Sequence, residues 1–257
     1  MRILALNLRA GGNATTIPQI VRRVAHRDAE VVVFSEFRDT VAGQLARGEL
    51  ERIGLSHQAF TPATRGNGVL IAAAAPFTAL PNPFGFSDAE YPNAILLARF
   101  EGLQMYGVYL PGQDRKWPHL RCLIAAAKRH NEAGDRALCI GDLNSGRNDA
   151  DIEINVRSGR LRDEFSTAGL YHEFEEQWTE AWAYLHPEQY EFSWYPLRRD
   201  PDYRSYAGWR IDKALLSPEL LTTLEAAEYD HVFRRDRLSD HSALVVDLRD
   251  PAEVEPI

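Results

Sequence analysis

The chain has 257 residues, of which 45% are hydrophobic and 26% charged; this composition allows a large core and excludes a mainly disordered polypeptide. Its formal net charge of −8 argues against a protein that binds nucleic acid through a broadly basic surface. A nuclease is not excluded, because metal-binding carboxylates contribute negative charge themselves. No apolar run approaches the roughly 18 residues that cross a bilayer, and the first residues lack a signal-peptide layout. We therefore expect a cytoplasmic monomer without membrane association.

The first part of the chain alternates strand and helix signals. Residues 3–8 (ILALNL) and 31–37 (VVVFSEF) are short β-rich runs, which favours two strands. Between them, apolar residues recur at helical spacing over 17–24, and the pair Thr15-Thr16 can cap the start of that helix. A second helix is expected up to about residue 55.

The rest of the chain continues the same alternation. Strands are expected at 68–74, 93–100, 104–110, 137–143, 191–194, 209–216 and 243–248, and helices at 117–131 and 161–168. There is no internal repeat, low-complexity tract or long linker. The pattern predicts one α/β domain over residues 1–249, with two sheets and outer helices, followed by a frayed tail over 250–257.

Polar side chains fall within or directly beside the apolar strands. They are Asn7, Glu36, Tyr109, Asp142, Asn144, Asp212, Asp240 and His241. Taken singly, each is better explained as a turn former or a cap: GDLN alone resembles a turn, and SDH alone a helix N-cap. Buried polar groups destabilise a fold unless they are paired or bind a metal, so the whole set favours a functional site at one sheet edge.

These residue types suit the hydrolysis of a phosphodiester. Oxygen ligands without a thiolate or a histidine cluster favour Mg²⁺ or Mn²⁺ over structural zinc. The reaction needs a cation near a phosphate oxygen, a group that activates water, and donors for the transition state. Glu36 can supply the cation site and Asp142 the base, while the amides, the phenol and the imidazole of the set can donate.

The motifs that contain these residues resemble those of a known family. The ordered motifs LNLR, SEF, VYLP, GDLN, WRIDKALLSPEL and SDH resemble the endonuclease/exonuclease/phosphatase superfamily over nearly the whole chain. The resemblance implies an α/β fold, a four-layered sandwich of two mixed sheets packed face to face and flanked by helices. It also implies that Glu36 is the main metal ligand, with Asp240 and Asn7 nearby.

The resemblance implies catalytic roles as well. Asp142 would position or deprotonate the attacking water, and Asn144 would orient it. Asp212 would fix the ring of His241, which would hydrogen-bond the scissile phosphate. Tyr109 would donate to a phosphate oxygen.

Within the superfamily, the chain most resembles exodeoxyribonuclease III and the abasic-site endonucleases. Trp194 in FSWYP and Trp209 in GWRID match aromatic positions that line a pocket for a flipped abasic sugar, although ordinary packing explains both equally well. Arg115, six residues after Tyr109, resembles a basic residue that contacts DNA beside the lesion. The resemblance thus implies a DNA partner, and abasic-site endonuclease or 3′-5′ exonuclease activity, or both.

Some motif positions depart from the repair enzymes. SEF stands where they usually have Gln-Glu-Thr, and Gly112 stands where they have Asn or Gln. These departures leave open a divergent member that hydrolyses another phosphodiester or a phosphomonoester, such as RNA, a phospholipid or a soluble phosphate. A non-catalytic binding module is the other alternative, but such a protein is expected to lose the catalytic set first, and that set is present.

Overall fold

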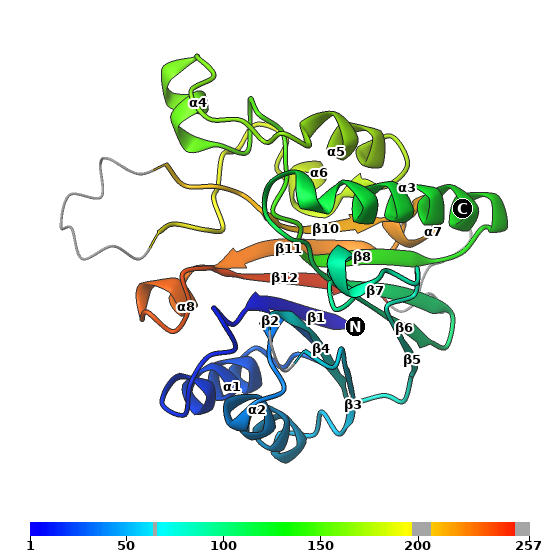
Figure 1. Cartoon of the computed structure of the whole chain (residues 1–257), viewed down its shortest axis with the longest axis vertical. Coiled ribbons are helices and arrows are strands. Elements are labelled where there is room, and N and C mark those ends of the chain that lie inside the picture. Colours follow the sequence, from blue (N-terminus) through cyan, green and yellow to red (C-terminus); the bar gives the residue numbers. More distant parts are fainter. Residues whose placement is uncertain (64–65, 197–206, 250–257) are drawn as a thin grey trace.

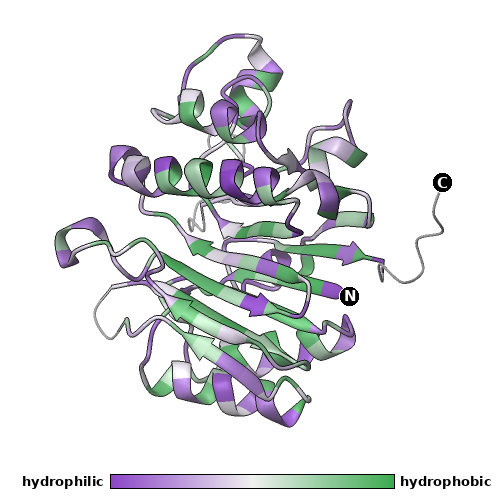
Figure 2. Ribbon diagram, turned by 90° about the vertical axis from the view of Figure 1, so that its right-hand side faces the viewer, coloured by the Kyte–Doolittle hydropathy of each residue, from purple (hydrophilic) through white to green (hydrophobic). Residues whose placement is uncertain are grey.

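Two six-stranded mixed sheets lie face to face, and helices cover their outer faces (Figure 1). The computed structural model describes residues 1–63, 66–196 and 207–249. Figure 2, seen from the end where the N-terminus lies, shows the four layers stacked one above the other, with apolar strands at the centre. The expected four-layered α/β sandwich is confirmed. The predicted frayed tail, 250–257, lies outside the described residues.

The first sheet contains both ends of the described chain. Its strands, in spatial order, are β11 (Leu224–Asp230), β12 (Ala243–Leu248), β1 (Arg2–Asn7), β2 (Val31–Phe37), β4 (Gly68–Ala73) and β3 (His57–Phe60). The strands β1 and β2 are parallel, and β12 pairs antiparallel on the other side of β1. Helices α1 (Thr16–His26) and α2 (Val41–Arg52) pack on the outer face.

The second sheet is covered by helices from the middle of the chain. Its order is β5 (Thr78–Pro81), β6 (Ile95–Phe100), β7 (Leu103–Tyr109), β8 (Ala137–Asp142), β10 (Asp212–Leu216) and β9 (Thr179–Glu180). Helices α3 (Trp117–Ala133) and α5 (Ala168–Glu175) pack on its outer face. The short helices are η1 (Asp88–Glu90), η2 (Gln113–Lys116), α4 (Glu153–Ser158), α6 (Ala181–Leu185), α7 (Pro218–Leu221) and α8 (Val232–Arg235).

The central strands are apolar on both faces because each face is covered. In β1, Ile3 and Ala5 contact the opposite sheet, whereas Leu4 and Leu6 contact the side of α1 and α2. Alternate side chains of a strand point to opposite faces, so a strand between two layers reads as a continuous apolar run. Among the described helices, none combines the length and the apolar character that crossing a bilayer requires.

The sequence predictions fail where burial is one-sided or absent. The edge strand β5 is exposed and β3 is only partly buried, neither carries an apolar run, and β11 reads LEAAEYD, a composition that favours a helix. Residues 161–167 form no helix, since α5 starts only at Ala168. Residues 191–194 form no strand; Trp194 makes only isolated bridges.

The start of α1 also differs from the prediction. Neither Thr15 nor Thr16 caps the helix with its side chain in the expected way. Instead, the side-chain oxygen of Asn13 accepts the backbone N–H groups of Thr15 and Thr16 at 2.9 and 3.0 Å. Asn13 therefore satisfies N–H groups at the start of the helix, including those of the threonines that were expected to cap it.

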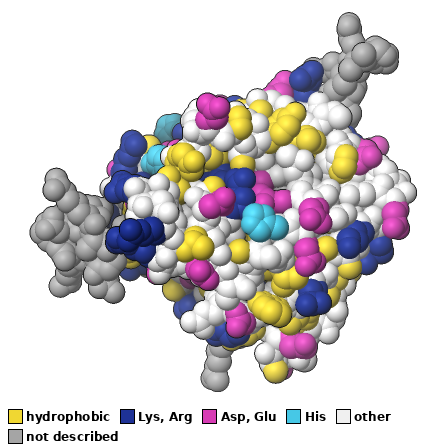
Figure 3. All heavy atoms as spheres, turned by 90° about the horizontal axis from the view of Figure 1, so that it is seen from above, with side chains coloured by type: hydrophobic (Ala, Val, Ile, Leu, Met, Phe, Trp, Pro, Cys, Tyr) yellow, Lys and Arg dark blue, Asp and Glu magenta, His cyan; other side chains and the backbone are white. Residues whose placement is uncertain are grey.

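Charged side chains of both signs are interspersed over most of the face above α3 and α5 (Figure 3). This face therefore shows no broad basic field, as the acidic composition predicts.

A buried ionic network holds the start of β10. The two oxygens of Asp151 accept from Arg210 Nε and Lys213 Nζ, each at 2.8 Å, and Glu180 accepts from Arg210 Nη1 at 3.0 Å. All four side chains are at most 3% exposed. Burial alone raises the pKa of Asp151, but the charges of Lys213 and Arg210 outweigh it and hold that pKa well below its usual range. The network fixes Arg210 and Lys213, which lie two residues before and one residue after Asp212.

We predict that Asp151→Asn lowers the free energy of unfolding by about 3–5 kcal/mol at pH 7, because it leaves two buried cations without their shared carboxylate. Urea denaturation measures this change. The exposed Asp149 provides a matched control, and Asp149→Asn should change stability by less than about 0.5 kcal/mol. Equal losses in the two variants would contradict a stabilising role for the network.

Candidate active site

Strand register gathers the polar residues at one end of both sheets. Tyr109 lies opposite Asp142 in the parallel pair β7–β8, and Asp142 lies opposite Asp212 in the antiparallel pair β8–β10. In the other sheet, Asn7 lies opposite Ser35. Residues from four distant parts of the sequence therefore meet where these strands end, as the sequence analysis expected.

A close approach between the sheets fixes their spacing at the site. Ser35 Oγ on β2 donates to Val108 O at 2.8 Å and accepts from the Asp142 backbone N–H at 3.2 Å. A Cβ on Gly141 would lie 2.2 Å from Val108 O, and its φ of +137° also disfavours other residues. The glycine of GDLN is therefore needed for a strand end, and this part of the motif is not a turn.

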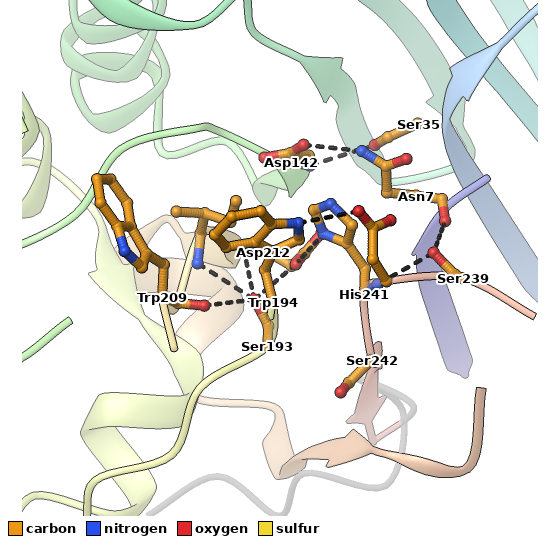
Figure 4. Close-up of polar contacts among 12 residues, drawn as sticks. Asn7, Ser35, Asp142, Ser193, Trp194, Trp209, Asp212, Ser239, His241 and Ser242 are labelled. Atoms are coloured by element: carbon orange, nitrogen blue, oxygen red, sulfur yellow. Dashed lines mark hydrogen bonds and ion pairs between the residues drawn. The ribbon is translucent and has the colours of Figure 1, made fainter. Parts of the chain in front are cut away.

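Asn7 joins the two sheets through its side-chain amide. Its Nδ2 donates to Asp142 Oδ2 at 2.9 Å (Figure 4). The same Nδ2 donates to Glu36 Oε1 at 3.2 Å, and Asn7 Oδ1 accepts from Arg9 N at 2.7 Å. The side chain is fully buried. Asn7 thus orients one carboxylate on each sheet, and its oxygen already has one partner.

Two site residues adopt a left-handed backbone conformation. Glu36 has a φ of +53° at the bulge in the β2–β4 pairing, and Asn144 has a φ of +48°. Glu36 Oε2 accepts from Ala10 N at 2.6 Å. Asn144 donates its backbone N–H to Asp142 Oδ1 at 2.9 Å and its Nδ2 to Leu110 O at 2.8 Å. Non-glycine residues rarely adopt this region, and such strain is concentrated at functional sites.

Asp212 and His241 form a buried pair. His241 Nδ1 lies 2.8 Å from Asp212 Oδ2 (Figure 4). Burial by itself lowers the pKa of His241, but the charge and hydrogen bond of Asp212, with smaller effects of Asp142 and Asp240, raise it to about 10. The ring is therefore an imidazolium at neutral pH, and its Nε2–H makes no hydrogen bond to the described residues.

Two serines that the sequence analysis did not single out hold this pair. Ser193 Oγ donates to Asp212 Oδ2 at 2.6 Å, and it accepts from the backbone N–H groups of Ile211 and Asp212 at 3.2 Å each. Ser239 Oγ donates to Asn7 O at 2.7 Å and accepts from His241 N at 3.1 Å. Ser239 opens the SDH motif but caps no helix; it ties the His241 loop to the end of β1.

The carboxyl group of Asp142 can exchange a proton near neutral pH. Burial raises its pKa, and the neighbouring Asp212 raises it further, while His241 and the donors Asn144 and Asn7 oppose the shift; the resulting pKa is about 7. Ligand atoms of Asp142, Asp212 and His241 lie within 4.8 Å of one another, close enough to surround an ion. A protonated imidazole has no lone pair, so His241 could ligate an ion only in its neutral form.

A buried carboxylate oxygen of Asp240 is a second candidate ligand for a cation. Asp240 Oδ2 accepts from Trp194 Nε1 at 3.1 Å, but Asp240 Oδ1 is buried and has no hydrogen-bond partner among the described residues. Such an oxygen is unfavourable unless a donor or a cation satisfies it. Both oxygens of Glu36 keep lone pairs beyond their single N–H contacts. These oxygen donors fit a hard divalent cation.

A pocket of about 210 Å³ opens beside Tyr109, and Arg38 and Arg115 both line it. Arg115 Nη1 donates to Tyr91 OH, and Arg38 Nε donates to Asn67 Oδ1, each at 2.7 Å. Both guanidinium groups keep further N–H donors. Burial, together with the charges of Glu36 and Asp142, raises the pKa of the Tyr109 phenol, which therefore stays a donor. Arg38 was not predicted; its only signal is its position two residues after Glu36.

The two predicted pocket tryptophans are neighbours, and Trp194 lies between Trp209 and His241 (Figure 4). Backbone hydrogen bonds of 2.9 Å join Trp194 and Trp209 in both directions. The Trp209 ring meets Phe165 edge-on at 4.8 Å and packs against a small apolar cluster, so packing accounts for part of its environment. Both tryptophans are half-buried. Their part in sugar binding stays a prediction.

The comparisons with known proteins identify the family to which this site belongs. The model of the Endonuclease/Exonuclease/phosphatase family matches residues 4–241. The chain belongs to this family. Members of the endonuclease/exonuclease/phosphatase family are hydrolases that act on phosphoester bonds, and the matched range contains every residue of the candidate site. No curated protein sequence matches the chain.

Three solved structures of the family share this fold at low sequence identity. An AP endonuclease from Archaeoglobus fulgidus has 18% identity and a TM-score of 0.77, covering 96% of this chain and 99% of its own. The 3′-5′ exonuclease NExo from Neisseria meningitidis has 18% identity and a TM-score of 0.77, with 97% and 100% covered. A variant of the 3′ phosphatase NExo from Neisseria, bound to a product DNA hairpin, has 17% identity and a TM-score of 0.79, with 97% and 100% covered.

We predict that His241 titrates with a pKa of about 10 in metal-free protein, and that Asp212→Asn lowers this pKa, because burial then acts without the neighbouring charge. Folding raises the pKa of His241, so the charged ring beside Asp212 stabilises the folded protein. This stabilisation is fully present below the ordinary pKa near 6.5 and is lost as the pH rises through about 10. Imidazole ¹⁵N NMR follows the titration. Asp88→Asn, at an exposed carboxylate in η1, should leave it unchanged. If Asp212→Asn leaves it unchanged too, Asp212 does not control the ring.

Proposed function

We propose that this protein hydrolyses phosphodiester bonds in DNA with Mg²⁺ or Mn²⁺, as an abasic-site endonuclease, a 3′-5′ exonuclease or both. The observation that carries the proposal is the position of Asp142. Its carboxyl group, with a pKa of about 7, shares the donor Asn7 with Glu36 on one side and neighbours the charged Asp212–His241 pair on the other. A base (Asp142), a candidate cation ligand (Glu36) and a donor to an anion (His241) are thus neighbours.

Each residue then has a role that its contacts support. Glu36 and Asp240 would hold the cation, which supplies Lewis-acid stabilisation of charge on the phosphate when it is bound. Asp142 would take the proton of the attacking water, since a base whose pKa is near 7 is suited to neutral pH. The two hydrogen bonds from Asn144 and Asn7 would keep that carboxylate aimed.

The phosphate itself would be held by donors around it. The His241 imidazolium would donate Nε2–H to a non-bridging oxygen, where its positive charge opposes the charge that develops as water attacks. Tyr109 would donate its phenol O–H to a second oxygen from the other side of the site. The water oxygen forms the new bond to phosphorus, and the sugar oxygen leaves with the bonding electrons.

The surroundings support a DNA substrate. The pocket beside Tyr109, at about 210 Å³, offers guanidinium donors from Arg38 and Arg115 to a neighbouring phosphate, which is how arginine commonly recognises such groups. Trp194 lies beside His241 with Trp209 as its neighbour, and their aromatic faces can contact an extruded sugar. Similar folds occur in an AP endonuclease and in an enzyme bound to a DNA hairpin.

A second candidate is the removal of a terminal phosphate from DNA. It is favoured by the similarity to a protein described as a 3′ phosphatase. The same base, cation site and imidazolium would serve a monoester, because only the substituent on phosphorus differs. The two activities therefore have to be separated by substrate.

We expect purified protein with Mg²⁺ to cut a duplex at an abasic site, or to shorten a blunt duplex from its 3′ end. A single strand and a hairpin with a 3′-phosphate complete the panel, and gel electrophoresis resolves the products. EDTA should abolish the reaction and added Mg²⁺ restore it. Asp142→Asn protein, purified in the same way, controls for contaminating nucleases.

Each result of the panel is informative. Full turnover in metal-free buffer would contradict the cation requirement. Release of phosphate from the hairpin alone would favour the phosphatase, and no hydrolysis of any DNA would contradict the proposed substrate.

Asp212 and His241 should act as one unit. His241→Ala and Asp212→Asn should each lower turnover by about 10²- to 10³-fold, the usual loss when one group that stabilises transition-state charge is removed. The double variant should be scarcely slower than His241→Ala, because Asp212 acts through the ring. Turnover at saturating Mg²⁺ decides the matter, and strictly multiplicative losses would show independent roles.

A further inference from the structure

The indole of Trp194 is bonded to a carboxylate of the candidate cation site. Its Nε1 donates to Asp240 Oδ2 at 3.1 Å, which the dashed line from this indole marks in Figure 4. The other oxygen, Asp240 Oδ1, is buried and has no partner among the described residues. One oxygen of Asp240 is therefore held by a neutral donor, and the other is available for a ligand that the described residues do not provide.

The backbone on both sides of Trp194 is also hydrogen-bonded to the loop that contains Asp240. The N–H of Tyr195 donates to Asp240 O at 3.2 Å, and the N–H of Ser242 donates to Ser193 O at 2.7 Å. Together with the indole contact, residues 193–195 thus make three hydrogen bonds to the loop that contains Asp240. Trp194 is itself fixed by its paired backbone bonds to Trp209. The indole N–H is thus presented from a rigid support.

The chemistry of the donor suits a cation ligand. An indole has one N–H and no acceptor, and it does not ionise, so its contact with a carboxylate can only hold that carboxylate in place. Partners that orient a ligating side chain in this way typically change metal affinity by about 10- to 100-fold when they are removed.

We propose that Trp194 is a positioning residue for divalent-cation binding: its N–H fixes Asp240 Oδ2 so that Asp240 Oδ1 faces the cation. The inference rests on the proposed function, because it takes Asp240 as a ligand. It assigns Trp194 a role beyond lining the sugar pocket. Trp209, which packs on Phe165, has no such contact with Asp240 and serves as the matched control.

The test is calorimetric titration of Mg²⁺ into wild-type protein, Trp194→Phe, Trp209→Phe and Asp240→Ala, without substrate. We expect Trp194→Phe to weaken Mg²⁺ binding by about 10-fold or more, Asp240→Ala to weaken it at least as much, and Trp209→Phe to keep the wild-type affinity. Urea denaturation of each variant separates loss of binding from loss of fold.

A second measurement needs only the wild-type protein, so it stands even if Trp194→Phe does not fold. The chain has five tryptophans, and their indole N–H signals can be followed by NMR during the Mg²⁺ titration. The signal of Trp194 should shift most and saturate with the calorimetric affinity, because its acceptor is the carboxylate that binds the cation.

The outcomes separate the inference from the proposed function. Wild-type affinity in Trp194→Phe, with binding lost in Asp240→Ala, would overturn the positioning role and leave the cation site intact. Wild-type affinity in Asp240→Ala, or no Mg²⁺ binding by the wild-type protein, would overturn the cation site as proposed, and the role of Trp194 with it.

Discussion

The site depends on one buried amide. Asn7 Nδ2 has two hydrogens, and it gives one to Glu36 on the first sheet and the other to Asp142 on the second. Two carboxylates that would otherwise repel are thereby held at a fixed separation by a neutral group. Ser35, which is paired with Asn7 across β1–β2, sets the distance between the sheets by its own contacts with Val108 and Asp142. The face-to-face packing and the local chemistry therefore rest on the same few bonds.

Near the Asn7 amide, one group of buried charges is fully paired and another contains a carboxyl group in excess. Asp142 and Asp212 face each other across β8–β10, an arrangement that would be unfavourable if both were ionised without compensation. His241 supplies the positive charge on the side of Asp212, and Asp142 is left with a pKa of about 7. A few residues away, Asp151, Arg210 and Lys213 form a fully paired network. The paired network is structural, whereas the pair with a surplus carboxylate is where a proton can move.

Much of this could be read from the sequence, and the reason is physical. Polar residues at the ends of apolar runs are visible in one dimension; strand register then brings Asp142 next to Asp212, and the packing of the two sheets brings Asn7 to Asp142. Ser193, Ser239 and Arg38 could not be identified, because their importance lies in partners that only the fold brings near. The contact between Trp194 and Asp240 was hidden for the same reason. The edge strands β3 and β5 were missed because a strand in contact with water on one side needs no apolar run.

The left-handed conformation of Glu36 and Asn144 has a consequence for how the protein can change. A residue other than glycine is destabilised there by roughly 1–2 kcal/mol. Glycine would relieve that strain at either position, but it would remove the Glu36 carboxylate that is proposed to bind the cation, or the Asn144 side-chain amide that donates to Leu110 O and to Asp142 Oδ2. Replacing either residue by glycine would therefore increase stability and reduce activity. Selection for thermal stability alone would favour a more stable but inactive protein, so these strained conformations are retained only while activity is selected.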